Sequence, residues 1–398
     1  MFATLEQLPP DPILGLGAAF REDPSPDKVD LSVGVYKDRA GNTPVMTVVK
    51  EAEQALIASQ ATKVYLPAAG SPGFREAIFK LVMGEQAADL RSRTAVLQAA
   101  GGCGALRLGA ELVQRAQPGA TLLLGDPTWP NHGPLLSGGG LQLLRHPYYD
   151  PATRSVVLQP VLDALSVASP GTLVLLQASC HNPTGVDPTR EQWEQILAVI
   201  TARRLVPFFD IAYQGLGDDP DTDAWPIREA ARKVPEMLVA VSSSKNFGLY
   251  RERTGALLVL AEDRDRAAAI ESHGNKAARA MYSMPPAHGA LIVERILTDP
   301  QRETAWRNEL AGMCTHIRGL RSKLAEGIMA ARPGYDASWI TRQRGMFSLL
   351  GIAREDVNTL REQHHIYMGY DSRANLAGLN EDNLPRVAEL VAPLLPGD

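Results

Sequence analysis

Short apolar runs alternate with longer amphipathic stretches through the middle of the chain. The runs are four or five residues long and are followed by polar residues, as in strands that a parallel sheet buries on both faces. The stretches between them repeat their apolar residues at helical spacing. The predicted strands are residues 121–124, 172–176, 205–209, 238–241 and 256–260. This alternation predicts an α/β fold with a mostly parallel sheet.

The stretch between the second and third strands begins with a helix start signal. Asp187 can cap a helix, and Pro188 suits the first turn because the missing backbone N–H has no helical partner there. An apolar face with helical period follows, formed by Trp193, Ile196, Leu197 and Ile200. Strand, helix and strand therefore make one crossover unit, which indicates parallel strands.

The pattern changes near Arg302, where a long charged helix begins and continues to about Ala330. Shorter apolar and helical segments come after it, around residues 346–350 and 383–395. We infer a second, smaller domain from this change.

Composition narrows the classes of function. The chain has 398 residues, a net charge of −5 and no block dense in lysine or arginine, which argues against a nucleic-acid surface. Its three cysteines have neither disulfide spacing nor metal-ligand spacing. The N-terminus lacks a basic segment leading into an apolar one, and no segment has the length and character of a membrane span. We expect a soluble, cytoplasmic protein that acts on small molecules, with no metal, membrane or nucleic-acid partner.

Reactive side chains follow three consecutive predicted strands. Asn182 comes after the second strand, Asp210 and Tyr213 after the third, and Lys245 after the fourth. In an open α/β sheet, ligands bind at the carboxyl ends of the strands, so we expect these side chains to meet. Their combination suits a pyridine aldehyde: the carboxylate keeps the ring nitrogen protonated, and the amide and the phenol bind the ring oxygen.

The lysine lies in a run suited to a cofactor that carries a phosphate. A partly desolvated amine attacks aldehydes, and Arg253, eight positions after Lys245, can grip a phosphate beside the small hydroxyl residues Ser242 and Ser244. The run that contains Gly102 and Cys103 opens a predicted helix, whose first backbone amides can bind the same phosphate. Together these features predict pyridoxal 5'-phosphate as the cofactor.

The segment that follows the first predicted strand supplies two more residues that fit the same site. Trp129 can stack on a planar ring, and His132 can support Asp210 from behind. A dinucleotide fold is a rival interpretation of the glycine-rich run, but Arg107 stands at the third glycine position of the G-x-G-x-x-G fingerprint.

Each candidate also has an ordinary interpretation. Lys245 can be a solvated lysine, Asn182 a turn residue and Asp210 a helix cap. Tyr213 can be a packing residue, and His132 a surface histidine. Their occurrence together at successive strand ends favours the functional interpretation.

Blocks of residues along almost the whole chain match one family in the same order. They are Asp11–Leu16, Gly34–Asp38, Tyr65–Pro67, Asp126–His132, His181–Gly185, Asp210–Gln214, Ser244–Tyr250, Arg279 with Tyr282–Ser283, Pro285–Gly289, Gly345–Ser348, and Arg373 with Asn375 and Ala377–Gly378. In these blocks the chain resembles the class I aminotransferases of the aspartate and aromatic amino acid group. The resemblance implies a fold-type-I architecture: a mostly parallel seven-stranded sheet between helices in a large domain, and a smaller α+β domain. We place the large domain at residues 44–312 and the small domain at 1–43 and 313–398.

The resemblance also implies a homodimer with shared active sites and ping-pong transamination through pyridoxamine phosphate. Lys245 would hold the cofactor and carry the proton, with Asp210, Tyr213 and Tyr65 as further catalytic residues. The cofactor-binding set it implies is Gly102, Cys103, Trp129, Asn182, Asp210, Tyr213, Ser242, Ser244, Lys245, Arg253 and, from the neighbouring subunit, Tyr65.

For the substrate, the resemblance implies that Arg373 clamps the α-carboxylate, helped by Gly34, Trp129 and Asn182. Arg279, crossing from the neighbouring subunit, would meet the distal carboxylate of a dicarboxylic substrate. His132 and His181 would support the site from behind.

Departures from the family pattern affect the expected substrate. Cys103 stands where a threonine or serine is usual, so a hydroxyl donor is replaced by a weaker thiol. Val64 and Met284 make the surroundings of the pocket more apolar. Val35, Lys37 and Thr43 resemble the aspartate-selective branch, while Tyr65–Pro67 resembles the aromatic branch.

We predict transamination of aromatic L-amino acids, tyrosine and phenylalanine, and of L-aspartate, with 2-oxoglutarate as the acceptor. A strict aspartate aminotransferase is the first alternative, and a fold-type-I decarboxylase or lyase is the second. A cofactor-binding regulator is a third class, but it usually needs a DNA-binding module, for which the residues before Asp11 leave no room.

Overall fold

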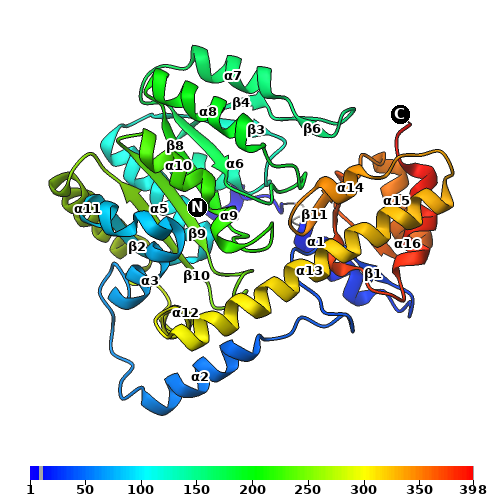
Figure 1. Ribbon diagram of the computed structural model, residues 1–398, viewed down its shortest axis with the longest axis horizontal. Coiled ribbons are helices and arrows are strands. Elements are labelled where there is room, and N and C mark those ends of the chain that lie inside the picture. Colours follow the sequence, from blue (N-terminus) through cyan, green and yellow to red (C-terminus); the bar gives the residue numbers. More distant parts are fainter. Residues whose placement is uncertain (9–11, 398) are drawn as a thin grey trace. The chain divides into compact units, whose positions relative to one another are not determined.

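A seven-stranded sheet forms the centre of the larger of two units in the computed structural model, which describes residues 1–8 and 12–397 (Figure 1). Strand β10 is antiparallel to both of its neighbours, and the remaining pairs are parallel. The predicted α/β fold with a mostly parallel sheet is therefore confirmed. In spatial order the strands are β2 (Thr94–Ala100), β10 (Thr254–Leu260), β9 (Met237–Ser242), β8 (Val206–Ile211), β7 (Leu173–Gln177), β3 (Thr121–Asp126) and β4 (Gln142–Pro147).

Helices cover both faces of this sheet. On one face, α5 (Gly101–Ala116) and α11 (Arg264–Tyr282) share an apolar core with alternate residues of the strands, among them Leu97, Phe208 and Leu257. On the other face, Trp193 of α8 (Arg190–Arg203) packs against Phe209 of β8, with ring centroids 6.1 Å apart. The strands are buried on both sides, which is why they are short continuous apolar runs in the sequence.

Helix α8 begins two residues later than its start signal indicated. Thr189, and not Asp187, is the N-cap: its hydroxyl accepts from the Gln192 N–H, and the Gln192 side chain accepts from the Thr189 N–H. This reciprocal pair satisfies two amide groups of the first turn. Asp187 instead accepts from the backbone N–H groups of Cys180 and His181. The predicted apolar face of α8 is buried as expected.

The larger unit contains residues 44–316 and 343–345. A two-stranded sheet of β5 (Tyr149–Asp150) and β6 (Ser155–Val156) also belongs to it. Its other helices are α2 (Thr47–Ser59), α3 (Pro72–Met83), α4 (Ala87–Leu90), α6 (His132–Ser137), α7 (Leu158–Val167), α9 (Pro220–Asp223), α10 (Trp225–Lys233), α12 (His288–Leu297) and the first half of α13 (Pro300–Ala331).

The smaller unit contains residues 1–43, 317–342 and 346–398. It has two small sheets, β1 (Val29–Asp30) with β12 (Ile366–Tyr367) and β11 (Phe347–Leu349) with β13 (Arg373–Asn375). Its helices are α1 (Pro12–Glu22), the second half of α13, α14 (Trp339–Arg342), α15 (Arg354–His364) and α16 (Leu384–Val391). Asp11, the start of the first matched block, lies outside the described residues.

Among the helices of residues 1–8 and 12–397, none is both long enough and apolar enough to cross a membrane.

Candidate active site

Four parallel strands of the larger unit end at one edge of the sheet. In the sheet β9, β8, β7 and β3 are successive neighbours, and Asp210 of β8 pairs with Gln177 of β7 and with Ala240 of β9. The side chains that follow these strands therefore gather at the same edge. The antiparallel strand β10 starts there, so Arg253, which precedes it, belongs to the same group.

Lys245 lies in this group with its Nζ 5.0 Å from the centre of the Tyr213 ring. Burial lowers the pKa of the Lys245 amine, and the charge of Arg253 lowers it further. Asp210 and Cys103 act in the opposite direction. A lowered pKa increases the fraction of neutral amine, which is the nucleophilic form.

Asp210 and His132 are both buried and hydrogen-bonded to each other. The distance between Asp210 Oδ2 and His132 Nε2 is 3.0 Å, and His132 Nδ1 lies 2.8 Å from Thr128 Oγ1. The ring of Trp129 packs edge-on against His132, with centroids 5.2 Å apart. A buried carboxylate held in this way presents a fixed negative charge at the sheet edge.

Asn182 is held through its backbone by one glutamine. The Asn182 N–H donates to Gln177 Oε1 at 2.9 Å, and Gln177 Nε2 donates to the Asn182 carbonyl at 3.0 Å. The neighbouring His181 stacks on Tyr148, with ring centroids 4.0 Å apart. Burial lowers the pKa of His181 to about 3, so His181 is neutral at physiological pH.

Backbone and side-chain donors for an anion lie near the lysine. Helix α5 begins at Gly101, and the residue before it supplies no side-chain cap, so the first amides of a 16-residue helix are available. Gly101 has φ +70°, and a Cβ there would collide with the Arg253 guanidinium. Arg253 donates to Ser244 Oγ at 3.2 Å, and Ser242 Oγ accepts from the Ser244 N–H. Amides, hydroxyls and a guanidinium form a cradle suited to phosphate.

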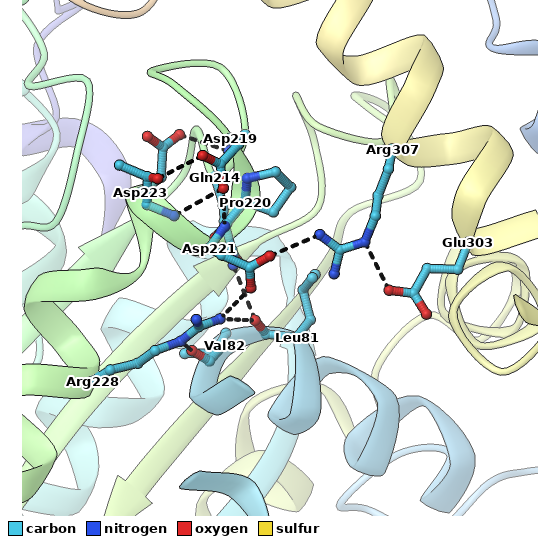
Figure 2. Close-up of polar contacts among 12 residues, drawn as sticks. Leu81, Val82, Gln214, Asp219, Pro220, Asp221, Asp223, Arg228, Glu303 and Arg307 are labelled. Carbon is cyan, nitrogen blue, oxygen red and sulfur yellow. Dashed lines mark hydrogen bonds and ion pairs between the residues drawn. The ribbon is translucent and has the colours of Figure 1, made fainter. Parts of the chain in front are cut away.

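The segment after Tyr213 is fixed by polar contacts (Figure 2). Gln214 Nε2 donates to the carbonyls of Leu81 and Pro220. The buried carboxylate of Asp223 accepts from the backbone N–H groups of residues 215, 217 and 218 at 2.7–3.0 Å. Asp221 makes ion pairs with Arg228 and Arg307. These contacts connect the turn that carries Tyr213 to α3, α10 and α13.

Two of the predicted site residues do not join this group. Tyr65 is 87% exposed, and Arg279, in the last turn of α11, is also exposed. In the same region the Leu66 N–H lies 3.3 Å from Met284 Sδ. A tyrosine and an arginine on the surface of one chain are available to a second chain.

The remaining predicted residues, Arg373 and Gly34, lie in the smaller unit. Arg373 is buried, stacks its guanidinium 4.4 Å from the centre of the Phe347 ring and donates to the Ser32 carbonyl. A Cβ at Gly34 would lie 2.7 Å from Phe347 Cζ, so only glycine fits there without moving the ring. The arginine is thus held with its planar face covered, as in sites that bind a carboxylate.

Sequence reasoning missed the residues that hold the predicted ones in place. Thr128, Gln177 and Gly101 contact His132, Asn182 and Arg253, respectively. Thr128 lies four positions before His132, and Gln177 directly follows a predicted strand, so both were near recognised motifs. Among the described residues, no group of three or more histidine, cysteine, aspartate or glutamate side chains is arranged to hold a metal ion.

Comparison with known proteins identifies the family. The model of the family "Aminotransferase class I and II" matches residues 26–391. The chain is 41% identical to an aromatic-amino-acid aminotransferase of Pseudomonas aeruginosa, and the match covers 98% of each chain. It is 39% identical to an aspartate aminotransferase of Haemophilus influenzae, over 99% of this chain and 100% of that one.

A solved structure agrees with these relatives. The crystal structure of an aromatic-amino-acid aminotransferase from Burkholderia pseudomallei, covalently bound to pyridoxal phosphate, superposes with a TM-score of 0.96 at 40% identity, covering 100% of both chains. Both the sequence match and the structural match extend over essentially the whole chain. The protein therefore belongs to the class I and II aminotransferases and is an aminotransferase.

Proposed function

We propose that the protein catalyses pyridoxal-phosphate-dependent transfer of the amino group between aromatic L-amino acids or L-aspartate and 2-oxoglutarate. The observation that carries the proposal is the position of Lys245, a lysine with a lowered pKa beside Tyr213 and next to a cradle for an anion. Relatives named as aromatic-amino-acid, tyrosine and aspartate aminotransferases, each about 40% identical over nearly the full length, support both substrate classes.

The residues of the larger unit fit this cofactor group by group. The phosphate would be held by the first amides of α5, Ser242, Ser244 and Arg253. Asp210, with His132 behind it, would hold the pyridine nitrogen in its protonated form. Tyr213 and Asn182 would bind the ring oxygen, Trp129 would cover the ring, and Lys245 would hold the aldehyde carbon covalently.

When bound, pyridoxal phosphate supplies an electron sink that stabilises negative charge at the substrate α-carbon. The chain supplies the acid and base. Once displaced by the substrate amine, Lys245 Nζ would accept the proton from the substrate α-carbon and would deliver it to the former aldehyde carbon of the cofactor. Its lowered pKa suits this work because a base with a pKa nearer to the working pH is more often neutral. Asp210 keeps the compensating negative charge fixed throughout.

Substrate binding is assigned to two arginines. Arg373, held flat against Phe347, binds the α-carboxylate as a fork, with the Gly34 backbone, Trp129 and Asn182 helping. Arg279 binds the distal carboxylate of aspartate, glutamate or 2-oxoglutarate. Aromatic substrates need no second cation, and Val64 and Met284, the apolar residues beside Tyr65, would serve them.

A homodimer completes the proposal. Tyr65 and Arg279 are both exposed in the single chain. The proposed chemistry uses the Tyr65 hydroxyl and the Arg279 guanidinium, so we infer that these groups act in a site other than the one described above. In a symmetric dimer each subunit can lend both residues to the partner's site. We also propose a cytoplasmic location, which agrees with three free cysteines.

The proposal is tested with the cofactor-loaded enzyme and one amino acid at a time. L-Aspartate and L-phenylalanine are added separately without any oxo acid, and the visible cofactor band and the oxo acid released are measured. Each amino acid is expected to bleach the band and release one oxo acid per site, and 2-oxoglutarate is expected to restore the band and yield glutamate.

Other outcomes identify the alternatives. Bleaching by aspartate alone would leave a strict aspartate aminotransferase. Carbon dioxide or ammonia as product, without an oxo acid retaining the whole carbon skeleton, would indicate a decarboxylase or lyase. Absence of any visible band after incubation with the cofactor would contradict the role of Lys245.

A further inference from the structure

A small cavity lies behind the candidate site, inside the larger unit. Its volume is about 30 Å³, and it is lined by residues of β3, β4, β7, α7, α8 and the loops beside them, including Thr128, His146 and His181. A water molecule needs roughly 10–15 Å³ of such volume and two to four polar partners. The cavity is therefore large enough for water, and it has polar atoms in its wall.

His146 lines this cavity and has a ring nitrogen without a protein partner among the described residues. The residue is only 6% exposed, and its Nδ1 lies 2.9 Å from the Pro147 carbonyl oxygen. Because a carbonyl only accepts, Nδ1 carries the proton, and Nε2 of the neutral ring is an acceptor. Burial lowers the pKa of His146, which favours that neutral ring. Within the described residues no protein group bonds to Nε2.

Thr128 lines the same cavity and has an acceptor of its own. Gln177 Oε1 accepts from the Asn182 N–H, so Gln177 Nε2 is a donor, and it lies 3.4 Å from Thr128 Oγ1. The hydroxyl proton of Thr128 is then directed to His132 Nδ1 at 2.8 Å, and His132 Nε2–H donates to Asp210 at 3.0 Å. Thr128 Oγ1 retains a lone pair that can accept one more hydrogen bond.

We propose that a water molecule binds in this cavity and donates one hydrogen bond to His146 Nε2 and the other to Thr128 Oγ1. The chain of hydrogen bonds that reaches Asp210 is thereby extended from Thr128 to His146. Every donor between the water and Asp210 points toward the carboxylate, so the water fixes the direction of the whole chain. His146 is then a positioning residue for Asp210, a role that rests on the proposed function of Asp210.

The two acceptors explain why water, and not a direct contact, satisfies the site. A buried acceptor without a donor costs about 1–3 kcal/mol. His146 Nε2 and the remaining lone pair of Thr128 Oγ1 cannot form a hydrogen bond with each other, because both are acceptors. One water offers two protons and satisfies both.

The first test is a high-resolution crystal structure of the cofactor-loaded enzyme and of His146→Phe. The native enzyme is expected to show one water within hydrogen-bonding distance of both His146 Nε2 and Thr128 Oγ1, and His146→Phe to lack it. A dry cavity in the native enzyme, or a water bonded to neither atom, would overturn the proposal. This result does not depend on which reaction the enzyme catalyses.

The second test measures the dissociation constant of pyridoxal phosphate. His146→Phe is expected to weaken binding about three- to tenfold, the equivalent of one net hydrogen bond. His146→Gln keeps an acceptor at similar reach and is expected to stay within about twofold of the native value. Val161→Ala, which lines the same cavity from α7 with apolar atoms only, is the control: it should unfold more easily but bind the cofactor normally.

A double variant distinguishes a bridge from two separate effects. If one water joins the two residues, the losses in affinity caused by His146→Phe and Thr128→Val are less than additive when combined. Additive losses, or equal weakening by His146→Gln and His146→Phe, would contradict the bridge. Normal oxo acid production by the native enzyme together with such results would reject the water while leaving the proposed function intact.

Discussion

Lys245 is the residue on which the proposed chemistry depends most directly. We expect Lys245→Ala to lose turnover by at least about 10³-fold, because both the covalent attachment and the proton transfer need its amine. Cofactor should still bind, since Ser244, Arg253 and the start of α5 remain. Turnover is measured with saturating aspartate, and retained cofactor by its absorbance after gel filtration.

Lys323→Ala serves as the control for this variant. Lys323 pairs with Glu381 on the surface of the smaller unit, and exposed ion pairs contribute little. Its turnover should match the native enzyme. Multiple turnovers at a native rate by Lys245→Ala would contradict the assignment.

His181 provides a pH dependence that can be worked out from its burial. Its pKa is about 3 in the folded protein, against an ordinary value of 6.5. Below pH 6.5 the unfolded chain takes up a proton that the folded chain refuses, so stability is lost as pH falls from 6.5 toward 3. Each pH unit in this range removes up to about 1.4 kcal/mol through this residue.

His181→Phe isolates that contribution because it keeps a ring to stack on Tyr148 but cannot titrate. At pH 7.5 the variant should be less stable, since the contact with Thr184 is lost. The difference between native and variant urea midpoints should then shrink as pH is lowered to 5.5. A difference independent of pH would show that His181 is not held neutral by burial.

At the scale of elements, the central strands of the sheet could be predicted from the sequence, and the edge strands could not. The runs at 121–124, 172–176, 205–209, 238–241 and 256–260 lie in strands, apart from residues 172 and 205, which directly precede theirs, because burial on both faces leaves a continuous apolar signal. Both edge strands, β2 and β4, were absent from the predicted set. Most side chains of β4 are exposed and its sequence, from Gln142 to Pro147, has no apolar run that stands out, whereas β2 was not predicted although it is buried.

The start of α8 shows why a local signal can be misassigned. Asp187 and Thr189 both precede the helix and both are good caps. The choice between them depends on the other hydrogen bonds that each side chain makes. The Asp187 carboxylate accepts from the backbone N–H groups of residues 180 and 181, so it does not cap the helix. That demand for an acceptor comes from a loop after another element and is absent from the local sequence.

The candidate site residues also divide into those with a local sequence signal and those whose contacts appear only in the fold. Lys245, Asp210 and Asn182 could be chosen because they are chemically specific residues at strand ends. Thr128 and Gln177 have no distinctive chemistry, and their importance appears only when the hydrogen bonds to His132 and Asn182 are seen.

The segment between Tyr213 and α9 depends on one buried carboxylate. We expect Asp223→Ala to destabilise the protein by about 3–5 kcal/mol, because three backbone N–H groups lose the buried acceptor that Asp223 provides. Urea unfolding followed by circular dichroism measures the loss.

Asp219→Ala is the matched control in the same segment. Asp219 is exposed and caps α9 through the N–H groups of residues 221 and 222. Its removal should cost only about 1 kcal/mol, as for other helix caps. Similar losses in the two variants would show that Asp223 does not hold the segment in the way described.

At the scale of the whole molecule, the division into units was the hardest feature to derive. The chain changes unit at residues 316 and 317, within the continuous helix α13. A helix that continues through the change keeps its periodic pattern, so the sequence offers no break there. The sequence-based division after residue 312 therefore rests on the family resemblance and not on a signal of its own.

The proposed sharing of active-site residues between two subunits cannot be seen in a single chain. We expect Arg279→Ala to lower kcat/KM for aspartate about 10–100-fold and for phenylalanine less than about threefold, because only the diacid loses a charge-assisted pair. Steady-state rates with both amino acids measure the ratio. Equal losses would show that Arg279 does not meet a distal carboxylate.

Mixed dimers decide which subunit supplies Arg279. If it crosses the interface, a hybrid of Lys245→Ala and Arg279→Ala subunits has one site with both substitutions and one site with neither. Random assembly makes half of the dimers hybrid, so co-expression should restore about a quarter of the native sites. If Arg279 served its own subunit, each hybrid would contain one site without the lysine and one without the arginine, and aspartate turnover would not exceed the Arg279→Ala contribution. A recovery near one quarter therefore requires both a dimer and a shared site, since a monomer or a self-contained site cannot produce it.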